Sequence, residues 1–153
     1  MNQEQALADL QRHCESMPPV RAMGVRVVAL REGRLSLAAP LAANVNDKGC
    51  AFGGSLAGLM TLAGWGLATL KLAEAGEVAE VYVADSQLRY LAPLYGDLVA
   101  EAVIAPDTDW AASLQHLGRR GRARIAIQAR VGLPDGGDAC TLVAQFAMIR
   151  PAG

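Results

Sequence analysis

From Ala51 to Leu70 the chain carries no charged side chain. That length meets the criterion for a membrane-spanning helix, but alternating, half-buried strand patterns flank it on both sides and need a protein surface to pack on. A helix that is apolar on every face and lies outside lipid must be surrounded by protein. The sequence therefore predicts one buried central helix, at about residues 53–75, and no membrane span.

The segments around this helix have the patterns of one amphipathic helix and several short strands. The helix is expected at about residues 2–14, and two strands follow it, joined near Glu32 and Gly33. Four more strands come after the central helix, and residues 106–118 have the pattern of a loop with a helical turn. This order predicts an α+β fold, in which a long antiparallel sheet wraps around the central helix in a single domain, 1–153. Because an uncovered sheet edge and a half-covered helix are liabilities, a homodimer or a dimer of dimers is expected.

Composition excludes several classes of function. A net charge of −1 provides no global attraction for nucleic acid or for an anionic membrane. The three cysteines, Cys14, Cys50 and Cys140, are far apart in the sequence, which argues against disulfides and zinc sites and favours a reducing compartment. The polar start of the chain has no signal-peptide pattern. We therefore expect a cytoplasmic protein without a metal or a bound cofactor.

The stretch "NDKGCAFGG", Asn46 to Gly54, places a polar, glycine-rich turn directly before the central helix. The first backbone N–H groups of a helix have no partners within it, and the helix dipole makes this end positive. Glycine lets a ligand approach the backbone closely. The turn is therefore a candidate oxyanion site, although Gly53 and Gly54 could instead serve only tight packing of the helix on the sheet.

Two motifs resemble the hotdog thioesterase superfamily, and within it the family defined by the C-terminal domain of the YiiD type. One is the pattern Asn-x-x-Gly-x-x-aromatic-Gly-Gly from Asn46 to Gly54, and the other is "RYLAP" followed by "GDL". The resemblance covers about residues 20–150. It implies the hotdog fold and a substrate that is an acyl thioester of acyl carrier protein or coenzyme A. Part of the resembling family is associated with decarboxylation of malonyl-acyl carrier protein to the acetyl form, which links it to the initiation of fatty acid synthesis.

The chain departs from the hydrolases of this superfamily wherever they carry a charged or basic residue. Phe52 stands where many have histidine, Thr61 where many have a carboxylate nine residues later, and Asn46 where another branch has aspartate. Hydrolysis of a thioester needs an activated water or a nucleophile. Asp47 and Asp85 are the remaining candidates. Asp47 could instead cap the turn or face solvent, and Asp85 could pair with Arg89 or with the helix end.

Decarboxylation of a malonyl thioester fits uncharged residues better. It needs donors for the oxygen of the enolate and a dry pocket, and a fixed carboxylate would repel the substrate's own carboxylate. We assign the oxyanion donors to the Asn46 amide and to the N–H groups of Gly54 and Ser55. Thr61 would offer its hydroxyl, unless that group bonds back to its own helix. Pocket walls and further substrate contacts are expected from Phe52, Gly53, Leu56, Met60, Asp47 and Asp85.

The run "GRRGRAR" adds Arg119, Arg120, Arg122 and Arg124. Acyl carriers are acidic and phosphopantetheine carries a phosphate, so arginines beside the mouth of the site would suit either, while a solvated strand face explains them equally well. Phosphopantetheine or coenzyme A would enter as part of the substrate. Three functional classes stay open: a malonyl-thioester decarboxylase, a thioester hydrolase, and an acyl-binding module without catalysis.

Overall fold

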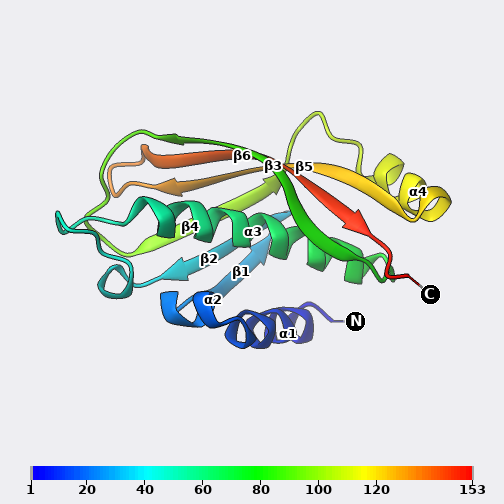
Figure 1. Ribbon diagram of the computed structural model, residues 1–153, viewed down its shortest axis with the longest axis horizontal. Helices are drawn as coiled ribbons and strands as arrows, with labels where there is room; N and C mark the ends of the chain where they lie inside the picture. The colour runs from blue at the N-terminus through cyan, green and yellow to red at the C-terminus, as the bar shows by residue number, and fades with distance from the viewer. Residues whose placement is uncertain (1, 153) are drawn as a thin grey trace.

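The computed structural model describes residues 2–152 as one curved sheet with a long helix along its concave side (Figure 1). The helices are α1 (Gln3–Ser16), α2 (Pro18–Met23), α3 (Gly53–Glu74) and α4 (Trp110–Arg120), with a 3-10 turn, η1, at Leu41–Ala43. The strands are β1 (Arg26–Arg31), β2 (Arg34–Ala39), β3 (Glu80–Tyr90), β4 (Leu98–Ile104), β5 (Arg122–Gly132) and β6 (Asp138–Ile149).

The sheet has six strands in the order β1-β2-β4-β5-β6-β3, and every neighbouring pair is antiparallel. Alternate side chains of β5 and β6 point toward α3 and are buried, among them Ile125, Ile127, Leu142 and Phe146. This arrangement of a long antiparallel sheet around one central helix is the hotdog fold, as the sequence predicts. The central helix ends at Glu74, one residue before the predicted boundary.

Glycines let α3 lie close to the sheet. A Cβ built on Gly64 would come within 2.7 Å of two ring atoms of Phe146, and one on Gly66 would come within 3.0 Å of Leu35. The helix is long and apolar enough to cross a membrane by length and composition alone, but 61% of that stretch is buried within the protein. Ala57, Thr61, Trp65 and Thr69, spaced four residues apart, are only half-buried. One chain therefore leaves a stripe of its central helix partly uncovered.

Two helices differ from the sequence prediction. Helix α2, which the sequence pattern did not predict, begins at Pro18, a position where the missing N–H of proline costs nothing. Residues 110–120 form the full helix α4 rather than a loop with a helical turn. The Asp109 carboxylate caps α4 by accepting from the Ala112 N–H, and Leu117 anchors it in the core. The capping aspartate was visible in the sequence, but its helix was too short for the hydrophobic pattern to define.

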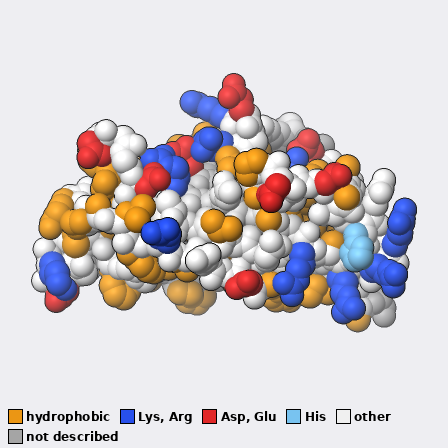
Figure 2. All heavy atoms as spheres, turned by 90° about the horizontal axis from the view of Figure 1, so that it is seen from above, with side chains coloured by type: hydrophobic (Ala, Val, Ile, Leu, Met, Phe, Trp, Pro, Cys, Tyr) orange, Lys and Arg blue, Asp and Glu red, His pale blue; other side chains and the backbone are white. Residues whose placement is uncertain are grey.

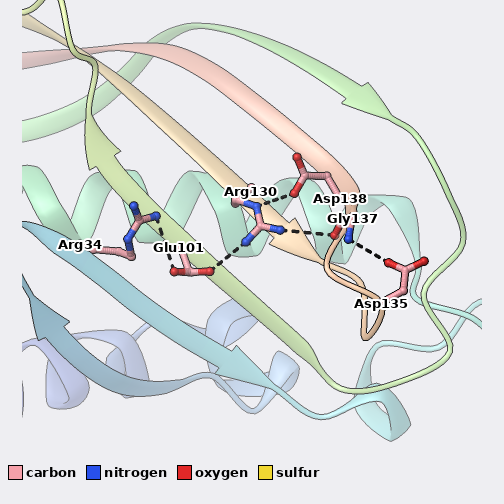
Figure 3. A network of polar contacts seen from close by, with 6 residues as sticks. All are labelled: Arg34, Glu101, Arg130, Asp135, Gly137 and Asp138. Carbon is pink, nitrogen blue, oxygen red and sulfur yellow. Dashed lines mark hydrogen bonds and ion pairs between the residues drawn. The ribbon is translucent and has the colours of Figure 1, made fainter.

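Four charged side chains join neighbouring strands on the convex face of the sheet (Figure 3). Arg130 on β5 donates to Glu101 on β4 at 3.0 Å and also to Asp138 at the start of β6, while Arg34 on β2 lies 3.6 Å from Glu101. All four are partly exposed, so the pairs are partly screened by solvent. The network links β2, β4, β5 and β6 and sets two positive charges against two negative ones.

Strand β3 forms one edge of the sheet and is exposed along nearly its whole length. Only β6 pairs with it among the described residues, so the backbone groups of its outer edge have no partner strand. Tyr82, Val83 and Tyr90 on this strand are large, apolar and about half exposed. A long edge of this kind, without proline or lysine to block it, is a surface that proteins normally cover.

Candidate active site

The Asn46 side chain organises the turn that precedes α3. Its Oδ1 atom accepts hydrogen bonds from the Lys48 N–H at 2.8 Å and the Cys50 N–H at 3.1 Å, and its Nδ2 lies 3.2 Å from the Cys50 sulfur. The backbone closes the same loop, because Val45 and Ala51 form an isolated β-bridge and Gly49 adopts a positive φ of 85°. Asn46 is therefore held in one orientation, with one of its two amide hydrogens directed at Cys50.

Helix α3 begins directly after this turn without a capping side chain. Its first backbone hydrogen bond runs from the Leu56 N–H to the Phe52 carbonyl, so the N–H groups of Gly53, Gly54 and Ser55 precede the bonded part of the helix. The Phe52 ring lies against Gly54, and the Tyr90 ring comes within 3.5 Å of the position that a Cβ of Gly53 would take. Both rings are more than half exposed. The helix start is thus an open set of donors between two aromatic side chains.

Three predicted site residues lie further along α3, in different surroundings. Ser55 is buried in the first turn of α3. Met60 is completely buried and belongs to the core rather than to an open pocket wall. The Thr61 hydroxyl donates to the Ala57 carbonyl at 2.8 Å, which is the bond back to its own helix that the sequence left open. Its hydrogen is therefore not free for a substrate carboxylate.

Neither candidate carboxylate is directed at the start of α3. The Asp47 side chain is 81% exposed and pairs with the Lys48 ammonium at 2.9 Å. Asp85 is opposite Gln145 of β6, on the convex face of the sheet and away from α3. An ion pair with Arg89, one alternative that the sequence left open for Asp85, is not among the ion pairs of residues 2–152. Neither Asp47 nor Asp85 of the same chain therefore places a fixed negative charge at these donors.

The arginine cluster lies at the other end of the molecule, so within one chain it does not stand beside the site, which was one of the two positions that the sequence left open. Arg119 and Arg120 end α4, and Arg122 begins β5. Gly121 between them bonds to Arg150, whose side chain pairs with Glu77 just after α3 ends. At 1.5 Å per residue α3 is about 33 Å long. The run "GRRGRAR" does not by itself indicate at which end of α3 the arginines lie.

Two residues that the sequence analysis did not select also shape the site. Asn44 is buried, accepts the Phe52 N–H at its carbonyl, and donates from its amide to the carbonyls of Met23 and Pro40. Its Oδ1 is buried without a hydrogen-bond partner among residues 2–152. The sequence could have pointed to both residues. Tyr90 lies within the "RYLAP" motif, and Asn44 is the first of the two asparagines in "NVN".

Other reactive groups in the chain are distant or buried. Burial, with a contribution from the neighbouring Glu15, raises the pKa of the Cys14 thiol to about 11, and burial also raises the pKa of Cys140. Among residues 2–152, no cluster of three His, Cys, Asp or Glu side chains could hold a metal ion. Five surface hollows, two between α1 and α3 and three on the sheet, are lined by residues other than Asn46, Gly54 and Thr61.

Comparison with known proteins identifies the class to which this arrangement belongs. A family model described as "Putative thioesterase (yiiD_Cterm)" matches residues 7–150. A protein of unknown function from Chlorobaculum tepidum TLS is similar in structure, with 28% identity, a TM-score of 0.90, and coverage of 97% of this chain and 96% of that one.

Two further solved structures share the fold at lower identity. One is described as a "putative thioesterase" from Shewanella oneidensis, with 24% identity, a TM-score of 0.82, and coverage of 95% of this chain and 98% of that one. The other is a thioesterase from Haemophilus influenzae, with 18% identity, a TM-score of 0.73, and coverage of 94% and 90%. The chain belongs to the YiiD C-terminal-domain family of the hotdog thioesterase superfamily.

Proposed function

We propose that this protein is an enzyme that decarboxylates a malonyl thioester, carried by acyl carrier protein or coenzyme A, to the acetyl thioester. The observation that carries the proposal is the start of α3, where unpaired N–H groups follow the turn that Asn46 closes and neither Asp47 nor Asp85 is directed at them. Family membership supports the thioester as the substrate class. The reaction would place the protein in the cytoplasm, in the supply of acetyl groups for fatty acid synthesis.

The reaction breaks the bond between the α carbon and the carboxylate of the malonyl group. The electron pair of that bond passes into the thioester as an enolate, with the negative charge on the carbonyl oxygen, and CO2 leaves. A proton from water then returns to the α carbon. No base is needed to start the reaction, so the catalyst has only to stabilise the enolate oxygen, and removing one such donor typically costs on the order of 10²–10³ in rate.

The chain offers specific donors for that oxygen. The N–H groups of Gly54 and Ser55 point out of the helix start, and the positive end of the α3 dipole adds to them. Asn46 keeps one amide hydrogen that is not directed at Cys50, held in place by the two bonds to its Oδ1. Gly53 permits close approach, and the rings of Phe52 and Tyr90 would exclude water from two sides. The Thr61 oxygen can still accept from an ordered water.

We further propose that the working form is a homodimer joined across β3. The exposed edge of β3 and its half-exposed Tyr82, Val83 and Tyr90 support this, because a second copy of the strand would pair with the backbone and cover these side chains. A twofold axis near the middle of β3 would join two sheets into one. The open side of the α3 start would then face the partner chain. Sedimentation velocity on the wild type and on a Val83→Lys variant would test this, since only the wild type should be dimeric.

Hydrolysis is the second candidate, and the thioesterase descriptions of the family and of two solved relatives favour it. It would need a carboxylate at the α3 start, and neither Asp47 nor Asp85 of the same chain is directed there. In a dimer the partner could supply one. Hydrolysis therefore requires a base beside the thioester, whereas decarboxylation does not.

Mass spectrometry of the products from malonyl-acyl carrier protein and malonyl-coenzyme A tests the proposal. We expect the acetyl thioester and CO2 to accumulate with the thioester bond intact. A free thiol carrier would show hydrolysis instead. Unchanged substrate that nevertheless binds would indicate an acyl-binding module without catalysis.

A further inference from the structure

A hollow of about 540 Å³ lies between α4 and the strands β5 and β6, at the end of the molecule opposite the start of α3. Figure 2 shows Lys and Arg side chains gathered around a histidine at this end. The hollow is lined by His116 of α4, Arg122, Ala123 and Arg124 of β5, and Ala147 and Ile149 of β6. Ala123, Ala147 and Ile149 give the hollow an apolar surface, and Arg122 and Arg124 add positive charge. Arg119 and Arg120 lie at the end of α4.

The arginines of this hollow are not neutralised by the protein. The ion pairs among residues 2–152 use other cations, and none of Arg119, Arg120, Arg122 and Arg124 takes part in one. Glu80, which is opposite Ile149 in the sheet, accepts a hydrogen bond from the Tyr82 hydroxyl instead. Elsewhere on the convex face Arg130 is paired with two carboxylates. Four unpaired guanidinium groups within six residues of sequence are a surface suited to phosphate, which arginine binds through two parallel donors.

The position of the hollow indicates which site it could serve. Within one chain, Glu80 and Tyr90 are the two ends of β3, roughly 33 Å apart at 3.3 Å per residue, and Tyr90 marks the start of α3. Pairing of β3 with a copy of itself about its middle would bring the Glu80 end of the partner's β3 beside the Tyr90 end of this strand.

The register of the sheet then sets the distance to the hollow. Glu80 is opposite Ile149, and Ile149 is opposite Arg122. At about 4.8 Å per strand, the partner's Arg122 would stand about 14 Å from Tyr90. Both sit at strand ends, so a flexible arm could pass around the end of the sheet from the convex face to α3.

We propose that this hollow binds the phosphate-bearing end of the thioester's carrier, and that it does so for the active site of the partner chain. The inference rests on the proposed thioester chemistry and on the β3 dimer, and it adds the chemical group recognised and the residues that recognise it. His116, Arg122 and Arg124 contact the phosphate, while Arg119 and Arg120 add attraction for the acidic carrier. Coenzyme A and carrier-bound phosphopantetheine both supply this chemistry.

Binding of coenzyme A, phosphate-free pantetheine and phosphopantetheinylated carrier protein, measured by calorimetry, tests the assignment. We expect the Arg122→Ala/Arg124→Ala variant to bind coenzyme A, the carrier protein or both at least about tenfold more weakly, equivalent to about 1.4 kcal/mol, and pantetheine unchanged. The matched control is Arg26→Ala/Arg31→Ala, which removes two exposed arginines from β1. The ligand that is weakened identifies the source of the phosphate. Unaltered binding of both phosphate-bearing ligands would overturn the proposal.

The same titration separates this proposal from the proposed reaction. Suppose that the wild type turns over no thioester but binds the phosphate-bearing ligands more tightly than the double variant does. The phosphate site is then supported and the proposed reaction is contradicted. If the wild type turns over its thioester but the double variant has an unchanged KM, the reaction stands and the hollow falls.

Mixed dimers test whether the hollow serves the partner. One chain carries Asn46→Asp, which damages the active site, and the other carries Arg122→Ala/Arg124→Ala, which damages the hollow. If each active site uses the hollow of its partner, a mixed dimer has one site in which both parts are intact. If each site uses its own hollow, a mixed dimer has none. Random mixing should then restore about a quarter of wild-type activity at low substrate concentration. Activity no higher than that of the two variants measured separately would contradict service to the partner.

Discussion

The Phe52 ring lies directly over Gly54: a Cβ built on Gly54 would stand 2.5 Å from Cε2 of that ring. The contact joins the last residue before α3 to its second residue, at the point where the unpaired N–H groups begin. A side chain at position 54 therefore cannot be added without turning the ring away. The Phe52 residue is 54% exposed, so its ring has room to turn.

Gly54→Ala should lower kcat/KM for the malonyl thioester at least tenfold, because the new methyl group and the displaced ring would cover the donors. The free energy of unfolding should change by less than about 1 kcal/mol, since alanine is the better helix former. Gly58→Ala is the matched control one turn further along α3, where a Cβ would meet only the Met23 side chain at 3.7 Å. Equal kinetics in the two variants would argue against a site at the helix start.

Thr61→Val should leave kcat and KM for the thioester within about threefold of wild type. The reason is the bond from the Thr61 hydroxyl to the Ala57 carbonyl, which already uses its one hydrogen. Steady-state kinetics on purified variant and wild type would decide. A hundredfold loss of kcat would show that the hydroxyl turns toward the substrate and donates to it.

Gly64→Ala should destabilise the fold by about 1–3 kcal/mol, as overpacking of a dense core does. The added methyl group would meet Phe146, which has no exposed surface, and Ile127 at 3.3 Å. Urea denaturation gives the free energy of unfolding. The second-site change Phe146→Leu should recover part of the loss in the double variant, and strictly additive losses would refute the contact.

Cys14 should make stability depend on pH in the alkaline range. Its folded pKa of about 11 lies above the ordinary thiol value of 9.0, so the native state holds the proton more tightly. That contribution is complete below pH 9 and is lost as the pH rises toward 11. Urea denaturation at pH 8, 9 and 10 under reducing conditions should show a steeper fall for the wild type than for Cys14→Ala. Parallel curves would mean that the thiol does not titrate in this way.

Much of the fold was predictable because the hydrophobic pattern of each segment indicates its secondary structure and its buried face. The charge-free run defined α3 to within one residue at its end, and the alternation in β5 and β6 gave their buried faces. Helix α4 was underestimated, because its capping Asp109 and single buried Leu117 carry a weak pattern in a short segment. Local patterns determine elements, whereas which elements meet depends on packing between distant segments.

The site was less predictable for the same reason. The sequence located the helix start and its uncharged neighbours, but not the direction of any side chain. It could not show that Asn46 closes its own turn, that Asp85 lies on the convex face, or that Met60 belongs to the core. The distance between Arg122 and the α3 start depends on the length of α3 and the strand order together, and neither appears in a motif.

The most direct test of the account is the product analysis of Asn46→Asp with a malonyl thioester. Aspartate keeps an oxygen acceptor for the Lys48 and Cys50 N–H groups, so the turn should persist, but it replaces an amide donor with a negative charge. Asn2→Asp makes the same change at the cap of α1, where an oxygen accepts from Gln5, and serves as the control. We predict that acetyl thioester formation falls by on the order of 10² or more in Asn46→Asp alone, with the melting temperature unchanged. Decarboxylation at the wild-type rate in that variant would contradict the claim that uncharged donors at the start of α3 hold the enolate.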